Sequence, residues 1–458
     1  MLKKLFGPTD MTVGAPWKAI LLFTLPMILG NIAQQLYNTV DTIVVGKYIG
    51  DNALSAVGSA GPIVNMLLVL FIGISTGASI MVAQYFGAKS RKDLSYTIGN
   101  CITITAIACI ILIAVAAPLI RPVLVMLNTP ESIIDSCAGY LMISVIGGAG
   151  IAYYNILSGI IRGMGDSVSA LIYLLVATVI NIALDILFVA KFNLGVPGVA
   201  LATVIAQIVS SILCLVKLSR MREHFDFGLE YLKPKAHYVK TIIRLGLPSG
   251  LTQAIFSSAM IVVQALTNQF GEQFIAANVV IMRVDGFAMM PNLSFGAAMT
   301  TYAGQNVGAG LYDRVTRGAK QGTALAVGCA TMITAIILLF GKGLMGIFTD
   351  TQELVELSYY LMKILAVGYI AFAVTQSLSG IMRGAGDTVT PMWISLATTI
   401  LFRVPLAYGI SYLTRTPELP IGRFECIHIS LLSAWVMGAV LTFFFYRLGR
   451  WKRKALKD

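Results

Sequence analysis

Long apolar stretches recur along the whole chain and are separated by short polar segments. Each stretch holds about 20 residues or more, which is enough for an α-helix to cross a hydrocarbon core about 30 Å thick. The pattern therefore predicts an all-α integral membrane protein with twelve transmembrane helices. These helices are expected at residues 17–45, 53–85, 95–120, 132–161, 168–190, 196–219, 239–267, 274–305, 316–341, 354–380, 389–413 and 427–448.

An internal repeat divides this pattern into two halves. The segment Ser158–Ala170 recurs as Ser379–Pro391 at an offset of 221 residues, with eight of thirteen positions identical. Each copy follows the fourth predicted helix of its half and contains Arg-Gly-x-Gly-Asp, for which we expect a tight turn with an Arg–Asp interaction. Repeats of this kind build two-lobed transporters. The predicted organisation is two pseudo-symmetric six-helix lobes, residues 1–219 and 239–458, joined by a cytoplasmic linker at residues 220–238.

The distribution of charge sets the expected orientation. Only 12% of residues are charged, about half the share of a soluble protein. If the N-terminus is cytoplasmic, 24 of the 33 basic residues fall in inside segments and six in outside loops. The positive-inside rule then places both termini in the cytoplasm of a multi-pass protein of the cell membrane. The net charge of +12 is explained by basic loops beside anionic membrane lipids, so no nucleic-acid partner is expected.

Two polar stripes lie inside predicted helices of the first half. Gln34, Asn38 and Asp41 share one helix face, and Asn181 and Asp185 share another. An acid within a spanning helix costs about 2.5–3.5 kcal/mol on insertion scales, so each requires a reason. The two acids predict a common cation site. The alternatives left open are proton or sodium as the ion, and a purely structural role as hydrogen-bond partners between helices.

The second half has lost these stripes. The positions equivalent to Gln34, Asn38 and Asp41 hold Phe256, Met260 and Val263. We therefore expect the first lobe to bind a coupling ion and the second to present an apolar substrate surface. The candidates for the substrate cavity are Gln34, Asn38, Phe256, Met260, Met282, Arg283, Asp285 and Met289.

The second half has its own intramembrane charges, Arg283, Asp285 and Arg403. Arg403 is a candidate partner for Asp285. A functional role in attracting a cationic substrate and a structural role as an ion-pair network both remain open for these three residues.

The motifs together resemble the multidrug and toxic compound extrusion (MATE) family, most closely its prokaryotic DinF- and MepA-like branch. They are Leu25-Pro26, Val40-Asp41-Thr42, Gly87-Ala88, the two Ser-Gly-Ile-x-Arg-Gly-x-Gly-Asp copies and Asn181-Ile-Ala-Leu-Asp185. The resemblance implies antiport of cationic or amphipathic drugs against H⁺ or Na⁺ by alternating access. It also implies a role in ion coupling for Asp41, Asn181 and Asp185, and for Asn155 and Thr203.

Other functional classes fit the sequence less well. It contains no phosphate-binding loop and no motif typical of a hydrolase or metalloenzyme, so we expect neither an enzyme nor a cofactor beyond the coupling ion. The three histidines lack metal-ligand spacing. The alternative is a lipid-linked oligosaccharide flippase of related architecture, although the candidate cavity carries acids rather than the basic residues that a pyrophosphate would need. We expect the chain to function as a monomer.

Overall fold

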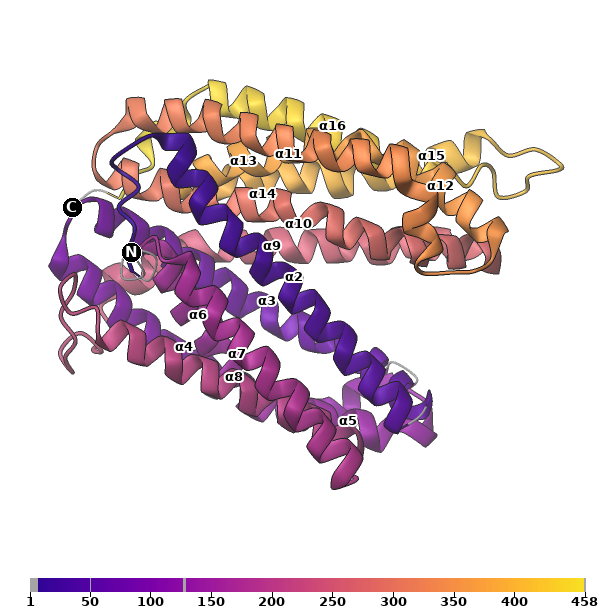
Figure 1. Cartoon of the computed structure of the whole chain (residues 1–458), viewed down its shortest axis with the longest axis horizontal. Coiled ribbons are helices and arrows are strands. Elements are labelled where there is room, and N and C mark those ends of the chain that lie inside the picture. The colour runs from indigo at the N-terminus through magenta and orange to yellow at the C-terminus, as the bar shows by residue number, and fades with distance from the viewer. Residues whose placement is uncertain (1–6, 50, 127–128, 457–458) are drawn as a thin grey trace. The chain divides into compact units, whose positions relative to one another are not determined.

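The computed structural model is built almost entirely from helices and describes residues 7–49, 51–126 and 129–456. Side chains at positions 38, 41–43, 45–46, 51–62, 65–66, 70 and 132 lie outside the described part. Figure 1 traces the helices from α2 to α16 in chain order. Their bounds are α2 Pro16–Tyr48, α3 Asp51–Gly87, α4 Arg91–Met126, α5 Glu131–Ile146, α6 Gly148–Gly163, α7 Ser167–Asp185, α8 Gly195–Ser219, α9 Ala236–Thr267, α10 Glu272–Gly308, α11 Tyr312–Gly346, α12 Gln352–Ala366, α13 Gly368–Gly384, α14 Val389–Ser395, α15 Val404–Leu413 and α16 Cys426–Arg447. Two π-helices, η1 (Ile186–Lys191) and η3 (Leu396–Arg403), extend α7 and join α14 to α15. Two short 3₁₀-helices, η2 (Asn268–Phe270) and η4 (Arg450–Arg453), follow α9 and α16.

The predicted set of twelve membrane spans is confirmed. Within the described residues, ten helices are long and apolar enough to cross a bilayer, and two bent pairs complete the twelve. The pairs are α5 with α6 and α12 with α13, each bent by 44°. The sequence predicted each pair as one helix, at residues 132–161 and 354–380.

Close contacts at glycines accompany both bends. A Cβ on Gly147, between α5 and α6, would lie 2.3 Å from Cγ2 of Val204 on α8. A Cβ on Gly368, at the start of α13, would lie 2.6 Å from the ring of Trp435 on α16. In each half, therefore, the bend brings the backbone against a bulky side chain of that half's last helix.

The chain folds into two compact units whose boundaries differ from the predicted lobes. The first unit comprises Met1–Asp10 and Leu25–Gly250, and the second comprises Met11–Thr24 and Leu251–Asp458. The boundary inside α2 falls two residues before Pro26, and the boundary inside α9 falls two residues after Pro248. A proline inside a helix removes a backbone hydrogen bond, so these are positions where each helix can change its packing partner.

The first part of α9 belongs to the first unit because small residues bring it against α3. A Cβ on Gly77 of α3 would lie 2.5 Å from the carbonyl oxygen of Ile242 on α9. A Cβ on Gly246 of α9 would likewise lie 2.5 Å from the carbonyl oxygen of Gly73 on α3. Such contacts between small residues let helix backbones pack tightly in lipid.

The linker also belongs to the first unit, where it lies along the start of α4. Arg91 donates to Oδ1 of Asp226 and to the carbonyl oxygens of Arg222 and Glu223. Its hydrogen bond lowers the pKa of the Asp226 carboxyl below the usual value. Farther along, the carbonyl oxygen of Tyr231 would lie 2.2 Å from a Cβ on Gly99. The predicted polar linker is therefore a docked segment with fixed partners.

The repeat extends to the helix packing of both units. In the first unit, Gly159 and Gly163 on α6 pack against Ser75 and Ser79 on α3. In the second unit, the same offset of 221 residues places Gly380 and Gly384 on α13 against Gly296 and Thr300 on α10. The duplication thus preserves a close helix contact at the centre of each unit.

The paired Arg-Gly-x-Gly-Asp motifs form tight turns, as predicted, but the expected Arg–Asp interaction is replaced by others. Gly165 and Gly386 adopt φ values of 90° and 94°, which favour glycine. Asp166 accepts hydrogen bonds from the backbone N–H and hydroxyl of Ser169, and Asp387 accepts the same pair from Thr390. Asp166 is therefore the N-cap of α7, and Asp387 binds the second residue of α14. Asp166 also pairs with Lys217, whose Nζ lies 3.1 Å from Oδ2.

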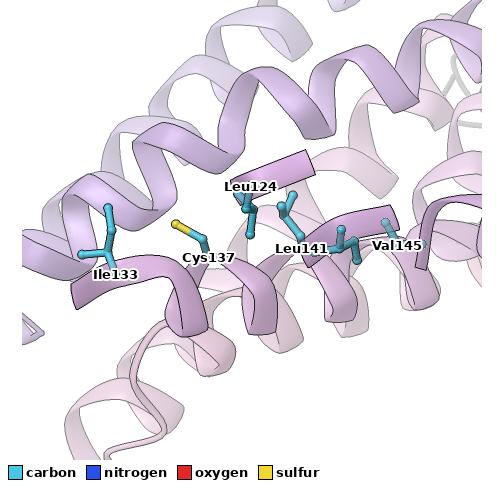
Figure 2. Close-up of a cluster of buried hydrophobic side chains, with 6 residues drawn as sticks. Leu124, Ile133, Cys137, Leu141 and Val145 are labelled. Atoms are coloured by element: carbon cyan, nitrogen blue, oxygen red, sulfur yellow. The ribbon is translucent and has the colours of Figure 1, made fainter. Parts of the chain in front are cut away.

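An apolar cluster joins α4 to α5 in the first unit. Figure 2 shows side chains of α5 lying along Leu124 of α4. Cys137 is fully buried in the cluster, where it packs as a small apolar residue. The buried members are Ile120, Leu124, Ile133, Cys137, Leu141 and Val145.

The N-terminal segment that precedes α2 is anchored in the second unit. The side chain of Met11 is fully buried, and its N–H donates to Oε1 of Gln305 on α10 at 2.8 Å. Arg314 at the start of α11 donates to the carbonyl oxygens of Met11, Val13 and Gly14. Residues about 300 positions apart thereby form one structural element.

Candidate functional site

Two predicted residues of the first unit lie at the end of α7. Asn181 and Asp185 stand one helical turn apart, and both side chains are fully buried. Asp185 is the last residue of α7, and the π-helix η1 begins at the next position. A π-turn in a helix is frequently found beside a functional site. This segment thus holds a carboxylate and an amide inside the membrane-spanning part of the fold.

A hydroxyl of α8 connects Asn181 to α2. Thr203 accepts a hydrogen bond from Nδ2 of Asn181 at 3.4 Å and another from the hydroxyl of Tyr37 at 3.1 Å. The structure thus brings together Asn181 and Thr203, two of the predicted residues. Sequence reasoning missed Tyr37, although it lies four residues before Asp41 and therefore on the same face of α2.

The remaining candidates of the first unit have no described contact with Asn181 or Thr203. The side chains of Asn38 and Asp41 lie outside the described residues, although the backbone of α2 continues through both positions. Gln34 is exposed on the same helix. Asn155 on α6 donates to the carbonyl oxygen of Ile151 at 2.8 Å, within its own helix. A role for these four in ion coupling or substrate binding stays a prediction.

The ligand types gathered here suit a small hard cation. A carboxylate, an amide oxygen and hydroxyl oxygens are the groups that coordinate such ions. The same set can instead receive and pass on a proton, because a carboxylate inside a membrane protein is a proton-carrying group.

The second unit contains a cavity of about 230 Å³ among its own helices. Five of the residues predicted for a substrate cavity line it, and their role in substrate binding stays a prediction: Phe256, Met260, Met282, Asp285 and Met289. Arg283 is exposed on α10 and is not among the residues that line the cavity, so its role in substrate binding stays a prediction. On α10, positions 283 and 285 are about 200° apart, which directs the two side chains to different faces.

Three aromatic rings and three methionine side chains line the cavity, together with aliphatic and polar groups. Phe372 of α13 packs against Trp435 of α16, with ring centroids 5.4 Å apart. Methionine side chains adapt to ligands of different shape, and aromatic rings supply large flat contacts. The wall is therefore suited to amphipathic organic molecules.

The charged groups on this wall come from different helices. The hydroxyl of Tyr369 on α13 donates to Oδ1 of Asp285 at 2.6 Å. Arg403, the last residue of η3, interacts electrostatically with Asp285. The predicted partner is thus nearby, but Tyr369 makes the direct hydrogen bond. No sequence signal identified Tyr369, because 84 residues separate it from Asp285.

Comparison with known proteins gives one consistent result. The family model described as MatE matches residues 26–187 and 248–409, which together are more than half of the chain. The chain is 28% identical to the probable multidrug resistance protein YoeA of Bacillus subtilis (strain 168), over 96% of this chain and 95% of that protein. It is 26% identical to the probable multidrug resistance protein NorM of Thermotoga maritima, over 96% and 94% of the two chains.

Solved structures have the same fold. A MATE protein crystallised in complex with MaL6 superposes with a TM-score of 0.89 at 23% identity, covering 96% of this chain and 97% of that one. A transporter of the MOP superfamily from Pyrococcus furiosus gives the same TM-score, identity and coverage.

Proposed function

Because the chain belongs to the MATE family of multidrug efflux transporters, we propose that it is a secondary active antiporter. It exports amphipathic organic cations and is driven by the entry of H⁺ or Na⁺. The first unit binds the coupling ion, and the second unit provides the cavity that holds the substrate. Family membership favours this function over the flippase alternative, since the curated relatives are named as multidrug resistance proteins.

The observation that carries the proposal is the pair of fully buried polar residues on α7. Asn181 and Asp185 stand in a helix that spans the membrane. Placing an acid there costs about 2.5–3.5 kcal/mol on insertion scales. Thr203 and Tyr37 extend the polar environment onto two further helices. A structural contact between helices would not require so many ligand groups, whereas binding of a cation does.

The coupling step follows from the charge of these groups. Binding of a proton or sodium ion neutralises a carboxylate that otherwise stands in a medium of low dielectric constant. The neutral and charged forms therefore stabilise different packing arrangements of the helices that hold Asn181 and Thr203. Alternating access is the transport cycle that uses this difference.

The membrane setting is part of the proposal. The distribution of basic residues places both termini in the cytoplasm, in the inner or plasma membrane of a prokaryotic cell. Membrane lipids contact the apolar helix surfaces, and the chain operates as a monomer.

The test measures uphill transport by purified protein in liposomes. Ethidium movement is followed after imposing a pH gradient, a sodium gradient or neither. We expect one of the two gradients to drive accumulation by the wild-type protein. Asp185→Asn should abolish the driven component because the amide cannot carry the charge. Asp135→Asn, which changes an exposed carboxylate paired with Arg121, should transport at the wild-type rate. Uphill transport by Asp185→Asn at the wild-type rate would show that Asp185 is not the coupling group.

A further inference from the structure

The last membrane span of the second unit ends in a short basic turn with a fixed conformation. Gly449, which follows α16, has a φ of 69° in the left-handed region, and η4 begins at the next residue. Trp451 of η4 is only 2% exposed, and its Nε1 donates to the carbonyl oxygen of Tyr446 at 3.0 Å. The two rings stack, with centroids 5.5 Å apart and planes 11° apart. The turn is therefore folded back against the end of α16.

The same aromatic pair brings this turn close to the start of α11. The hydroxyl of Tyr446 is hydrogen-bonded to Thr316 in the second turn of α11. Arg317 and Lys320 follow on the exposed face of that helix. The two segments together carry seven exposed basic side chains, which we call the basic surface: Arg317, Lys320, Arg447, Arg450, Lys452, Arg453 and Lys454.

The protein does not neutralise this surface. Among the described residues, none of its seven side chains forms an ion pair, whereas Arg91 pairs with Asp226 and Lys217 pairs with Asp166. One exposed acid, Asp313, stands one turn before Arg317 on α11. Seven like charges beside a single acid repel one another, so the surface favours an anionic ligand.

Apolar side chains lie directly beside these charges. Phe443, Phe444 and Leu448 at the end of α16 are exposed. The guanidinium of Arg447 lies over the ring of Phe443, 5.5 Å from its centroid. The site thus has a cationic part and an adjoining apolar part, as a phospholipid requires for its headgroup and its acyl chains. A soluble anion would contact only the cationic part.

We propose that the basic surface binds anionic phospholipids of the cytoplasmic leaflet. The lipid phosphates lie at the basic residues of η4 and α11, and the acyl chains lie along the exposed apolar side chains of α16. Clusters of about 4–8 basic residues at the cytoplasmic end of a membrane span attract such lipids. A bound lipid contacts the start of α11 and the end of α16 together. The binding does not depend on the coupling ion or on the transported molecule.

The test compares two phospholipids with the same acyl chains. Purified full-length protein in detergent micelles is titrated with dioleoyl-phosphatidylglycerol or dioleoyl-phosphatidylcholine, and the bound lipids are counted by native mass spectrometry. We expect phosphatidylglycerol to bind at least about tenfold more tightly, because each basic residue near an anionic lipid contributes about a fivefold change in affinity. Raising the salt concentration from about 0.1 M to about 1 M should reduce the preference. A preference below twofold would overturn the proposal.

Variants assign the preference to η4. Combined replacement of Arg450, Arg453 and Lys454 by Gln should weaken the binding of phosphatidylglycerol at least about tenfold and leave that of phosphatidylcholine unchanged. The single variant Arg453→Gln keeps Trp451 and its contacts, so it tests the surface even if the combined variant does not fold. It should weaken the binding of phosphatidylglycerol about fivefold. Unchanged binding in Arg453→Gln would overturn the proposal.

The matched control removes the same charge from the first unit. Combined replacement of Lys92, Lys233 and Lys240 by Gln neutralises three exposed lysines that the positive-inside distribution also places in the cytoplasm. This variant should keep the full preference for phosphatidylglycerol. If it loses as much as the η4 variant, net charge and not the basic surface causes the preference, and the inference is wrong.

A competition experiment separates a lipid site from a site for soluble anions. Glycerol phosphate carries the same phosphate without the acyl chains. At the same concentration as the lipid, it should leave phosphatidylglycerol bound, because it cannot use the apolar side chains of α16. Displacement of half or more of the bound lipid would identify a site for soluble phosphates and would overturn the proposal.

Discussion

At the residue scale, Thr203 is the point where three helices of the first unit meet through polar groups. It accepts from Asn181 of α7 and from Tyr37 of α2, while its own backbone belongs to α8. A single hydroxyl therefore couples the position of the buried amide to that of α2. The site depends on this geometry as much as on its charges.

Removing this hydroxyl should uncouple transport from the ion gradient. In Thr203→Val, we expect the driven rate to fall at least about fivefold, since two hydrogen bonds are lost and each is worth about 0.5–1.5 kcal/mol. Thr203→Ser should keep most of the rate. Initial rates in liposomes check this. The control is Thr331→Val on α11, whose exposed hydroxyl donates to the carbonyl of Val327 in its own helix. Equal rates in Thr203→Val and the wild type would exclude the coupling role.

At the element scale, each unit is held by a pair of helices that touch through their backbones. The contact recurs at the same offset in both halves. We therefore infer that it was present in the six-helix unit before this unit was duplicated. Positions 159, 163, 380 and 384 all hold glycine on one side of it. The side chains that face the cavity or the proposed ion site have diverged, whereas this contact has been kept.

A methyl group at this contact should destabilise the second unit. In Gly384→Ala, the new Cβ would lie 2.2 Å from the carbonyl oxygen of Thr300, so α10 and α13 must move apart. Overpacking typically costs about 1–3 kcal/mol, and we expect a lower apparent Tm in detergent, measured by size-exclusion chromatography after heating. Gly328→Ala on α11 is the control, since a Cβ there meets no described atom within 4 Å. Equal loss in both variants would show that the close contact is not the cause.

The docked linker should respond to acid. Arg91 lowers the pKa of Asp226, so the pair contributes stability at pH values above the usual value of 3.8 and loses it as pH falls through the lowered pKa. Hydrogen exchange of residues 220–235, corrected for the intrinsic rate at each pH, checks this. Relative to Asp226→Asn, the wild-type linker should be more protected near neutral pH, and the difference should vanish in strong acid. A difference that persists unchanged below the lowered pKa would contradict this account.

The sequence predicted the helices and the repeat well because the bilayer imposes both the length and the apolar composition of each span. The bends after Ile146 and Ala366 escaped prediction because a glycine pair or a valine within an apolar stretch does not interrupt its hydropathy. Asn181 was identified by its polar side chain within an apolar helix and Thr203 only through the family resemblance, and their contact depends on the packing of α7 against α8. Tyr369 and His428 are ordinary apolar-stretch residues until the fold places them beside Asp285 and Arg403.

At the scale of the whole molecule, the two units share a scaffold and differ in chemistry. The first has a polar site made by Tyr37, Asn181 and Thr203, with Asp185 one turn away. The second has an aromatic cavity at the positions where the polar stripe was lost. The two sites therefore differ in polarity, as the predicted division of labour requires. The transport test above measures whether the first unit binds the coupling ion.

The orientation of the chain can be tested without transport. After replacement of the six native cysteines, single cysteines are introduced at the exposed positions Asp313 and Glu418. The positive-inside distribution places residue 313 in the cytoplasm and residue 418 outside. A membrane-impermeant maleimide should label Glu418→Cys in intact cells and Asp313→Cys only in inverted vesicles. The reverse pattern would contradict the assigned orientation.

The anchoring of Met11 has a consequence for biosynthesis. Its partner Gln305 is made 294 residues later, and at about 5–20 residues per second this delay is roughly 15–60 s. During that time the segment before α2 must wait at the membrane surface for its binding site to be synthesised. A half-molecule that begins at residue 251 would lack this segment altogether. The second unit is therefore complete only when residues 11–24 have bound to the helices that are made last.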